Sequence, residues 1–199
     1  AELRDKLAAA ERERDKFAES YSTASSAQDA LKKGLTAAQE TISELRAQIE
    51  AFCPYNEQET ADRLQMLQDI DTFPVLLTRD NATAHFTASC WIVNPDRTKV
   101  LMAYHNLYQS WAWLGGHARD IFSLEILHVA PHVKRGKFVC AHLHLNATYL
   151  LEADDQAPIR CKPDENSAVR WLDTAEVLAA ISEPAMLPVY RKLMEKAAR

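Results

Sequence analysis

Residues 3–52 carry an uninterrupted heptad pattern, and this pattern constrains the fold of that part of the chain more tightly than any other feature. The core positions alternate at spacings of four and three residues along the whole segment. A strict 3.5-residue repeat makes a helix wind left-handedly around a partner, because only a partner can bury the apolar stripe. The a positions are Leu7, Arg14, Tyr21, Gln28, Leu35, Ile42 and Ile49, and the d positions are Leu3, Ala10, Phe17, Ala24, Leu31, Ala38, Leu45 and Phe52.

The helix predicted over residues 1–52 has one weak point and one defined end. Gly34 costs about 1 kcal/mol relative to alanine inside a helix, because glycine loses more backbone freedom. Pro54 ends the helix, since proline has no N–H to donate and its ring clashes with the preceding turn. We therefore place a coiled-coil helix at residues 1–52 and a second domain at residues 53–199.

Self-association through residues 3–52 is the expected use of this helix. The alternative is a hairpin that folds back at Ser22–Ser26, although the heptad register continues through these serines. Arg14 and Gln28 at a positions weaken the seam but can fix register and strand number. A homodimer is the first choice, and the number of strands and their direction stay open.

Composition excludes several classes of partner. The net charge of -5 argues against nucleic-acid binding, which needs a concentrated basic face. No apolar run is long enough to cross a bilayer, and no basic-then-apolar leader opens the sequence, so we expect no membrane partner. The four cysteines include no CxxC pair. A reduced, cytoplasmic protein is therefore expected.

The pattern after residue 53 is that of an α/β (α+β) domain. Runs rich in β-branched and aromatic residues are separated by turn-forming residues, and amphipathic segments flank them. A turn composition at Asn94–Thr98 predicts a hairpin between the first two strands, and Lys134–Lys137 predicts another turn. We expect strands at 86–93, 99–105, 111–114, 122–129, 138–151 and 168–172, with helices at 55–67, 173–181 and 187–196.

Three sequence segments of this second part, taken in order, resemble the Nudix hydrolase family. They are His85–Met102, Trp111–His117 and Asp164–Thr174. In that family the first is the opening hairpin, the second precedes the catalytic helix, and the third is the strand before the last helix. The resemblance covers about residues 54–199 and implies a Nudix-like mixed β-sheet packed with helices. It also implies Mg²⁺ as cofactor and hydrolysis of the diphosphate bond of a nucleoside diphosphate linked to another moiety.

The segment after the diglycine departs from the family pattern. A glutamate is due five residues after the first glycine of the box, but counting from Gly115 or Gly116 gives Ile121 or Phe122. Only Ala118–Ile121 stands between the diglycine motif and the next strand, and four residues reach at most about 13 Å. Several turns of helix do not fit there. The carboxylates that would hold Mg²⁺ are thus absent, and we expect no efficient Mg²⁺-dependent hydrolysis.

Three accounts of the apparent deletion between Ala118 and Ile121 stay open. The chain carries a true internal deletion, the segment was removed by design or by a gene error, or two chain ends are joined across an absent loop. Loss of a helix should also strip one face of the sheet and expose apolar strand surface. The alternative function is a catalytically inactive Nudix-fold module that binds a nucleotide or a protein and is displayed on a coiled-coil oligomer. A third hypothesis treats the coiled coil as a fusion or tether.

The resemblance also points to individual site residues. Glu165 lies in the loop before the last strand, where some Nudix enzymes place a base or an extra metal ligand; a solvated cap of the turn is the equal alternative. Aromatic residues of the site could stack on a base, although such residues more often fill a core. The substrate-binding candidates are Arg79, Tyr104, Trp111, Trp113, Gly115, Gly116, His117, His142 and His144.

Histidines on the later strands raise the question of a metal site. His142 and His144 alternate on one strand, so both side chains lie on the same face and could reach one ion. His128 and His132 lie on the neighbouring run. Because no third ligand falls at a recognised zinc spacing, we predict a structural or substrate-lining role and assign no metal ligand.

Overall fold

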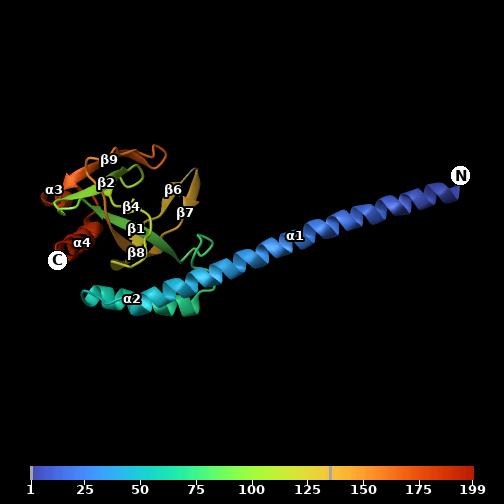
Figure 1. Cartoon of the computed structure of the whole chain (residues 1–199), viewed down its shortest axis with the longest axis horizontal. Helices are drawn as coiled ribbons and strands as arrows, with labels where there is room; N and C mark the ends of the chain where they lie inside the picture. Colours follow the sequence, from blue (N-terminus) through green and yellow to red (C-terminus); the bar gives the residue numbers. More distant parts are fainter. Residues whose placement is uncertain (1, 135) are drawn as a thin grey trace. The chain divides into compact units, whose positions relative to one another are not determined.

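The computed structural model describes residues 2–134 and 136–199 and consists of two compact units that divide between Leu45 and Arg46 (Figure 1). The first unit is the greater part of one long helix, α1 (Glu2–Ala51). The second unit holds the last turn of α1 and a mixed sheet packed with helices. The expected fold class is confirmed: a long helix precedes a mixed α/β domain.

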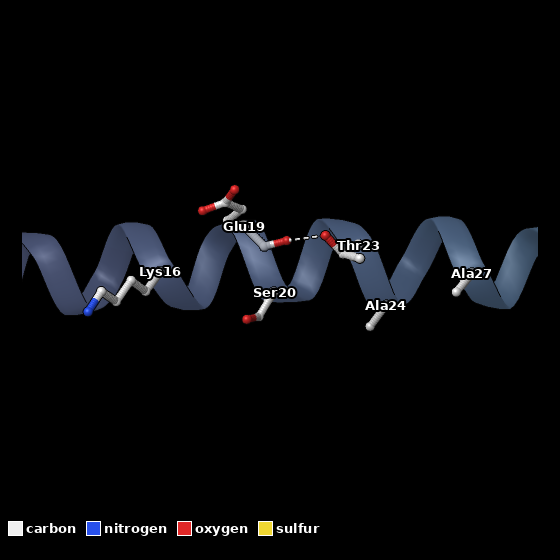
Figure 2. Close-up of a pocket in the computed structure, with 6 residues that line it drawn as sticks. All are labelled: Lys16, Glu19, Ser20, Thr23, Ala24 and Ala27. Carbon is white, nitrogen blue, oxygen red and sulfur yellow. Dashed lines mark hydrogen bonds between the residues drawn. The ribbon is translucent and has the colours of Figure 1, made fainter.

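The first unit presents its predicted seam to the surroundings. Phe17 is 76% exposed and Leu31 is 75% exposed. A shallow hollow runs along α1 from Lys16 to Ala27, where the Thr23 hydroxyl donates to the Glu19 carbonyl oxygen at 2.9 Å (Figure 2). A hollow on one face of a single helix encloses no ligand. What this unit offers for binding is the exposed apolar seam that includes Phe17 and Leu31. Within the described residues, no helix is both long and apolar enough to cross a membrane.

The last turn of α1 belongs to the second unit because its side chains and carbonyl groups are satisfied there. Ile49 is fully buried. The Arg63 guanidinium donates to the carbonyl oxygens of Ile49 (2.8 Å) and Glu50 (2.5 Å), which an α-helix leaves without partners at its C-terminus. Arg63 lies on α2 (Glu57–Thr72), whose first turn is capped by the Asn56 side chain accepting from the Glu59 N–H.

A long parallel pair forms the centre of the sheet. β1 (Ala84–Val93) pairs with β8 (His142–Glu152) from end to end, and β5 (Ser123–Val129) adds antiparallel to β8. The other half of the sheet is built on β2 (Lys99–His105), which pairs antiparallel with β9 (Asn166–Asp173). β3 (Ser110–Ala112) adds to β2, β4 (Leu114–Gly115) adds to β1, and β6 (His132–Lys134) and β7 (Lys137–Val139) form a separate two-stranded sheet.

The expected hairpin between the first two strands exists only beside its turn. β1 and β2 pair at Val93 and Val100 and then separate; farther along, β4 pairs with β1 at Ser89 and Cys90, and β3 pairs with β2 from Ala103 to His105. The strand expected at residues 138–151 is interrupted at Cys140 and Ala141, so β7 and β8 are distinct. The predicted turn at Lys134–Lys137 joins β6 and β7, and its residue 135 lies outside the described residues.

The helices after β9 build the main core. α3 (Thr174–Ala180) and the short 3-10 turn Pro184–Met186 lead into α4 (Leu187–Ala197). Tyr190 of α4 stacks on Trp91 with ring centroids 5.6 Å apart and meets Trp113 edge to face at 5.4 Å. All three aromatic rings belong to this core, so its energy comes chiefly from burial of large apolar area.

α2 lies along the outer edge of β5 and satisfies its backbone. The Gln58 amide donates to the Leu124 carbonyl oxygen at 3.1 Å, and the Ile126 N–H donates to the Asp62 carboxylate at 2.8 Å. Backbone groups at a sheet edge otherwise face solvent or pair with another strand. The helix therefore closes part of this edge without adding a strand.

The expectation of a bare apolar sheet face is wrong for the residues beside the diglycine motif. Cys90 and Tyr149 are 3% and 5% exposed, and Leu145 is fully buried. The short segment after β4 accounts for part of this cover, because it crosses directly over β1 and β8. Gly116 packs against the Cys90 side chain, and the His117 ring meets Tyr149 edge-on with centroids 6.5 Å apart.

Candidate functional site

Three histidines from two strands meet on one face of the sheet. The parallel register sets His85 of β1 beside His144 of β8, and the two-residue period of a strand puts His142 on the same face. The ring of His85 lies 5.1 Å from that of His142 and 4.8 Å from that of His144, centroid to centroid. One nitrogen of each ring lies within 4.8 Å of the others. Lone-pair donors from three side chains are thus directed at one small volume.

Hydrogen bonds orient two of these rings and leave the third without a partner. Nδ1 of His142 lies 2.8 Å from the Cys140 carbonyl oxygen, so Nδ1 carries the proton, because a carbonyl group only accepts. Nε2 of His142 then bears a lone pair and lies 3.2 Å from Nε2 of His144. His85 is only 5% exposed, and neither of its ring nitrogens has a hydrogen-bond partner.

Burial keeps two of these rings, His85 and His144, neutral. Loss of hydration, with smaller contributions from His85, His142 and Arg79, lowers the pKa of His144 to about 3. The pKa of His85 is lowered by burial first and then by His142 and Arg79. Both rings are therefore uncharged at pH 7, with lone pairs available. Arg79, a substrate-binding candidate from the sequence, lies close enough to act on this cluster electrostatically.

Two other candidates form a separate aromatic group. Tyr104 and Trp111 meet edge to face with centroids 5.6 Å apart, and the Arg170 guanidinium carbon lies 4.5 Å from the centre of the Trp111 ring. The Tyr104 hydroxyl donates to the Gln109 carbonyl oxygen at 3.0 Å. One face of Trp111 is therefore already used by a cation–π contact. Trp113 packs in the core instead, the alternative that we gave for such aromatics.

The diglycine motif is held by β1. The Gly116 N–H donates to the Ala88 carbonyl oxygen at 3.2 Å, and Gly116 has a φ of 154°, a value that other residues rarely adopt. A Cβ at this position would lie 2.8 Å from the Cys90 sulfur. His117, the next candidate, is exposed and reaches the Tyr149 ring rather than the histidine cluster.

Replacing Gly116 with alanine should lower the free energy of unfolding by about 1–3 kcal/mol, since both the backbone strain and the contact with Cys90 act in the same direction. Urea unfolding of Gly116→Ala, of Cys90→Ala and of the double variant that combines them tests this. Removal of the sulfur should restore only the part due to the clash, and the φ strain should remain. Equal stability of Gly116→Ala and the wild-type chain would contradict the description.

Glu165, the catalytic candidate, is part of a surface turn. Its carboxylate pairs with Lys162 at 3.2 Å, and the glutamate side chain is 46% exposed. Its carbonyl oxygen accepts from the Asn106 N–H at 3.0 Å. It does not belong to the group of three histidines. The geometry therefore places Glu165 at a turn held by local bonds.

Two of the buried carboxylates, Glu59 and Glu125, pair with lysines, and a third, Asp69, accepts from the Gln65 amide at 2.9 Å. The Lys192 ammonium lies 3.1 Å from Glu59 and 3.0 Å from Glu125, and Lys196 lies 2.8 Å from Glu59. Burial by itself would raise the pKa of Glu59, but bonds from Lys196, Ser123 and a backbone N–H, together with the charge of Lys192, lower it. Two carboxylates and two ammonium groups balance, so the network joins α2, β5 and α4 as ion pairs.

The donor set does not fit the Mg²⁺ that the family resemblance implies. Mg²⁺ prefers oxygen ligands in octahedral geometry. Among residues 2–134 and 136–199, the group of three or more potential ligand side chains within reach of one ion is His85, His142 and His144. Imidazole nitrogens suit later transition metals instead. No reaction step through Mg²⁺ is therefore derived for this chain.

Sequence reasoning identified two of the three clustered histidines and missed His85. That residue opens a strand and stands 57 positions before His142, so no local spacing connects them. Only the parallel pairing of β1 with β8 brings them together. The available signal was weak: His85 lies just before the strand expected at 86–93, and His142 and His144 lie within the strand expected at 138–151.

Comparisons with known proteins leave the family open. No protein-family model matches the chain, and no curated protein matches it. Solved structures similar to it include a mutator MutT protein from Bacillus halodurans, with 14% identity, a TM-score of 0.33, and 55% of this chain and 81% of that one covered. A MutT NUDIX hydrolase from Burkholderia pseudomallei has 15% identity and a TM-score of 0.30, over 56% and 98% of the two chains. A UDP-X diphosphatase has 11% identity and a TM-score of 0.29, over 82% and 95%. Superpositions this loose do not assign the chain to their family.

Proposed function

We propose that this chain is a self-associating binding module of Nudix-like fold that takes a nucleotide-type small molecule and does not perform efficient Mg²⁺-dependent hydrolysis. The observation that carries the proposal is the state of the carboxylates. Buried Glu59 and Glu125 are neutralised by lysines, buried Asp69 accepts from the Gln65 amide, and Glu165 is paired at a surface turn. Hydrolysis at the diphosphate would require clustered carboxylates from residues other than these.

The ligand would bind at the end of the sheet that carries the histidine cluster. Arg79 is exposed there, and its charge reaches both His85 and His144. A guanidinium group binds phosphate oxygens in a two-pronged manner, which suits a nucleoside diphosphate. The neutral His85 and His144 rings lie near it and add no positive charge of their own. This arrangement supports phosphate recognition and provides no group to activate water through Mg²⁺.

Self-association would use the exposed seam of the first unit, with a homodimer as the proposed state. Leu7, Phe17, Tyr21 and Leu35 are all more than half exposed along α1, as the heptad pattern requires of an unpaired strand. The seam ends inside the second unit, where Ile49 is already buried. Pairing is therefore proposed for the residues up to about Leu45, a shorter segment than residues 3–52.

Replacing Arg79 with glutamine should weaken binding of a nucleoside diphosphate about tenfold, because one charge-assisted contact to phosphate is lost. Titration calorimetry with ADP and with UDP measures the effect. Arg12→Gln on α1 is the matched control, since it removes the same charge far along the sequence from the site and should leave the affinity unchanged.

Phosphate release from the same nucleotides in the presence of Mg²⁺ tests the other half of the proposal. We expect release at the rate of the buffer blank. Turnover that depends on Mg²⁺ would overturn the binding-module function in favour of a hydrolase. If the calorimetric titrations show no heat of binding for ADP or UDP, the proposed class of ligand is refuted.

A further inference from the structure

We propose that His85, His142 and His144 form a binding site for a divalent transition cation, for which Zn²⁺ is the best fit. The site goes beyond the nucleotide-type ligand proposed above and does not depend on it. It rests on the positions of three imidazole rings and on the hydrogen bonds that they make or lack.

The spacing of the nitrogens matches a tetrahedral ion. Zinc–nitrogen bonds of about 2.0–2.1 Å at tetrahedral angles place two ligand nitrogens about 3.3 Å apart. The Nε2 atoms of His142 and His144 are 3.2 Å apart, and one nitrogen of His85 lies within 4.8 Å of both. A small rotation of the His85 ring would complete three ligands. Three protein ligands leave a fourth position for water or for an oxygen of a bound ligand.

The Cys140 carbonyl group prepares His142 for this role. It accepts from Nδ1 at 2.8 Å and so fixes the tautomer in which Nε2 holds the lone pair. Histidines that bind metals nearly always donate their other ring N–H to such an acceptor, which also orients the ring.

His85 provides an independent reason to expect an ion. A buried polar group without a partner is costly, and such groups are rare in folded proteins. A hydrogen bond between His142 and His144 would explain their contact without a metal. It would still leave both nitrogens of His85 unsatisfied inside the fold. A shared cation would give one nitrogen of His85 a partner and would use a lone pair from each of the three rings.

Two neighbouring groups limit or extend the site. The positive charge of Arg79 opposes a cation, but this side chain is exposed and is screened by solvent and salt. The His132 ring lies 6.3 Å from that of His142, and its Nδ1 lies 3.0 Å from the Ala130 carbonyl oxygen, so its Nε2 is available at the rim. His132 would become a fourth ligand only by moving closer, and we assign the fourth position to water.

Zinc binding to the full chain, after treatment with EDTA and its removal, tests the site. Competition with a chromophoric chelator should give one Zn²⁺ per chain, and Co²⁺ should produce the visible absorption of a tetrahedral nitrogen site. His85→Asn and His144→Asn should each weaken Zn²⁺ binding by at least about 100-fold, since removal of a direct ligand exceeds the 10–100-fold effect of its supporting partners. His128→Asn is the matched control, because His128 belongs to β5 and is not one of the three ligands.

The variants are checked by circular dichroism and thermal unfolding without metal, so that loss of binding is separated from loss of fold. A folded His85→Asn chain that binds Zn²⁺ as tightly as the wild type would overturn the site, as would binding that is lost in His128→Asn. Nucleotide titrations on metal-free and Zn²⁺-loaded chains keep this test distinct from that of the proposed function. Zinc bound without any nucleotide heat would sustain the site and refute the ligand class.

Discussion

Replacing Lys192 with methionine should lower the free energy of unfolding of the α/β domain by about 3–5 kcal/mol, the usual cost of removing one partner from a buried ion pair. The Lys192 ammonium lies 3.1 Å from Glu59 and 3.0 Å from Glu125 and also donates to the Gln58 amide oxygen at 2.7 Å. Methionine fills a similar volume but leaves two buried carboxylates with only Lys196 to balance them.

Urea unfolding at pH 7 measures this loss, and Lys6→Met provides the control. Lys6 makes an ion pair of similar length with Glu2, but both side chains are largely exposed, so its removal should change stability by less than about 1 kcal/mol. A loss for Lys192→Met as small as that of the control would show that the buried network contributes nothing specific.

Acidic pH should reduce the difference in unfolding free energy between the wild-type chain and Lys192→Met. Burial opposes ionisation of Glu59, but its lysine and serine partners hold its pKa below the ordinary value of 4.5. A lowered folded-state pKa contributes stability above the unfolded value, and that contribution is lost as the pH falls through the folded value. Wild-type stability should therefore fall toward that of Lys192→Met below about pH 4.5.

Introducing aspartate at both Leu31 and Leu35 should convert the proposed homodimer into a monomer at micromolar concentrations. Both residues are core positions of the heptad pattern, and each is more than 60% exposed on the single helix. Two charges buried against their symmetry mates would repel and lose hydration. Light scattering coupled to size exclusion gives the molar mass, and circular dichroism should show lost helix, because most of the stability of a helix in a protein comes from packing of its apolar face.

Ala30→Asp serves as the control for this pair. It lies on the same helix outside the seam, adds the same kind of charge, and should leave the dimer intact. The second unit should unfold at the same temperature in all three chains, because residues 1–45 form a unit of their own. A wild-type chain that runs as a monomer would refute self-association.

Local patterns predicted most elements of this fold. The strand expected at residues 99–105 is β2 (Lys99–His105), and the last helix, expected at 187–196, is α4 (Leu187–Ala197). Pro54 was expected to end the first helix, and α1 does end just before it, at Ala51. These elements depend on periodicity and on the residues at their ends, which a single sequence displays.

Contacts between distant segments could not be predicted in this way. The pairing of His85 with His144 depends on a parallel register that no turn specifies, and the contacts of Lys192 with Glu59 depend on how two helices approach β5. The shortness of the segment after Gly116 was visible in the sequence. The cover that it gives to the sheet was not, because the buried state of Cys90 and Tyr149 follows from how this segment crosses the sheet.

The position of α2 along β5 matters when several copies of the α/β domain are held close together. A coiled coil holds domains at millimolar effective concentration, at which unpaired strand edges recruit one another into growing fibrils. In this chain, side chains from Gln58 and Asp62 already occupy the outward carbonyl of Leu124 and N–H of Ile126. In the proposed homodimer, tethered copies can therefore stay close together while their sheets remain separate, and assembly is left to the helix.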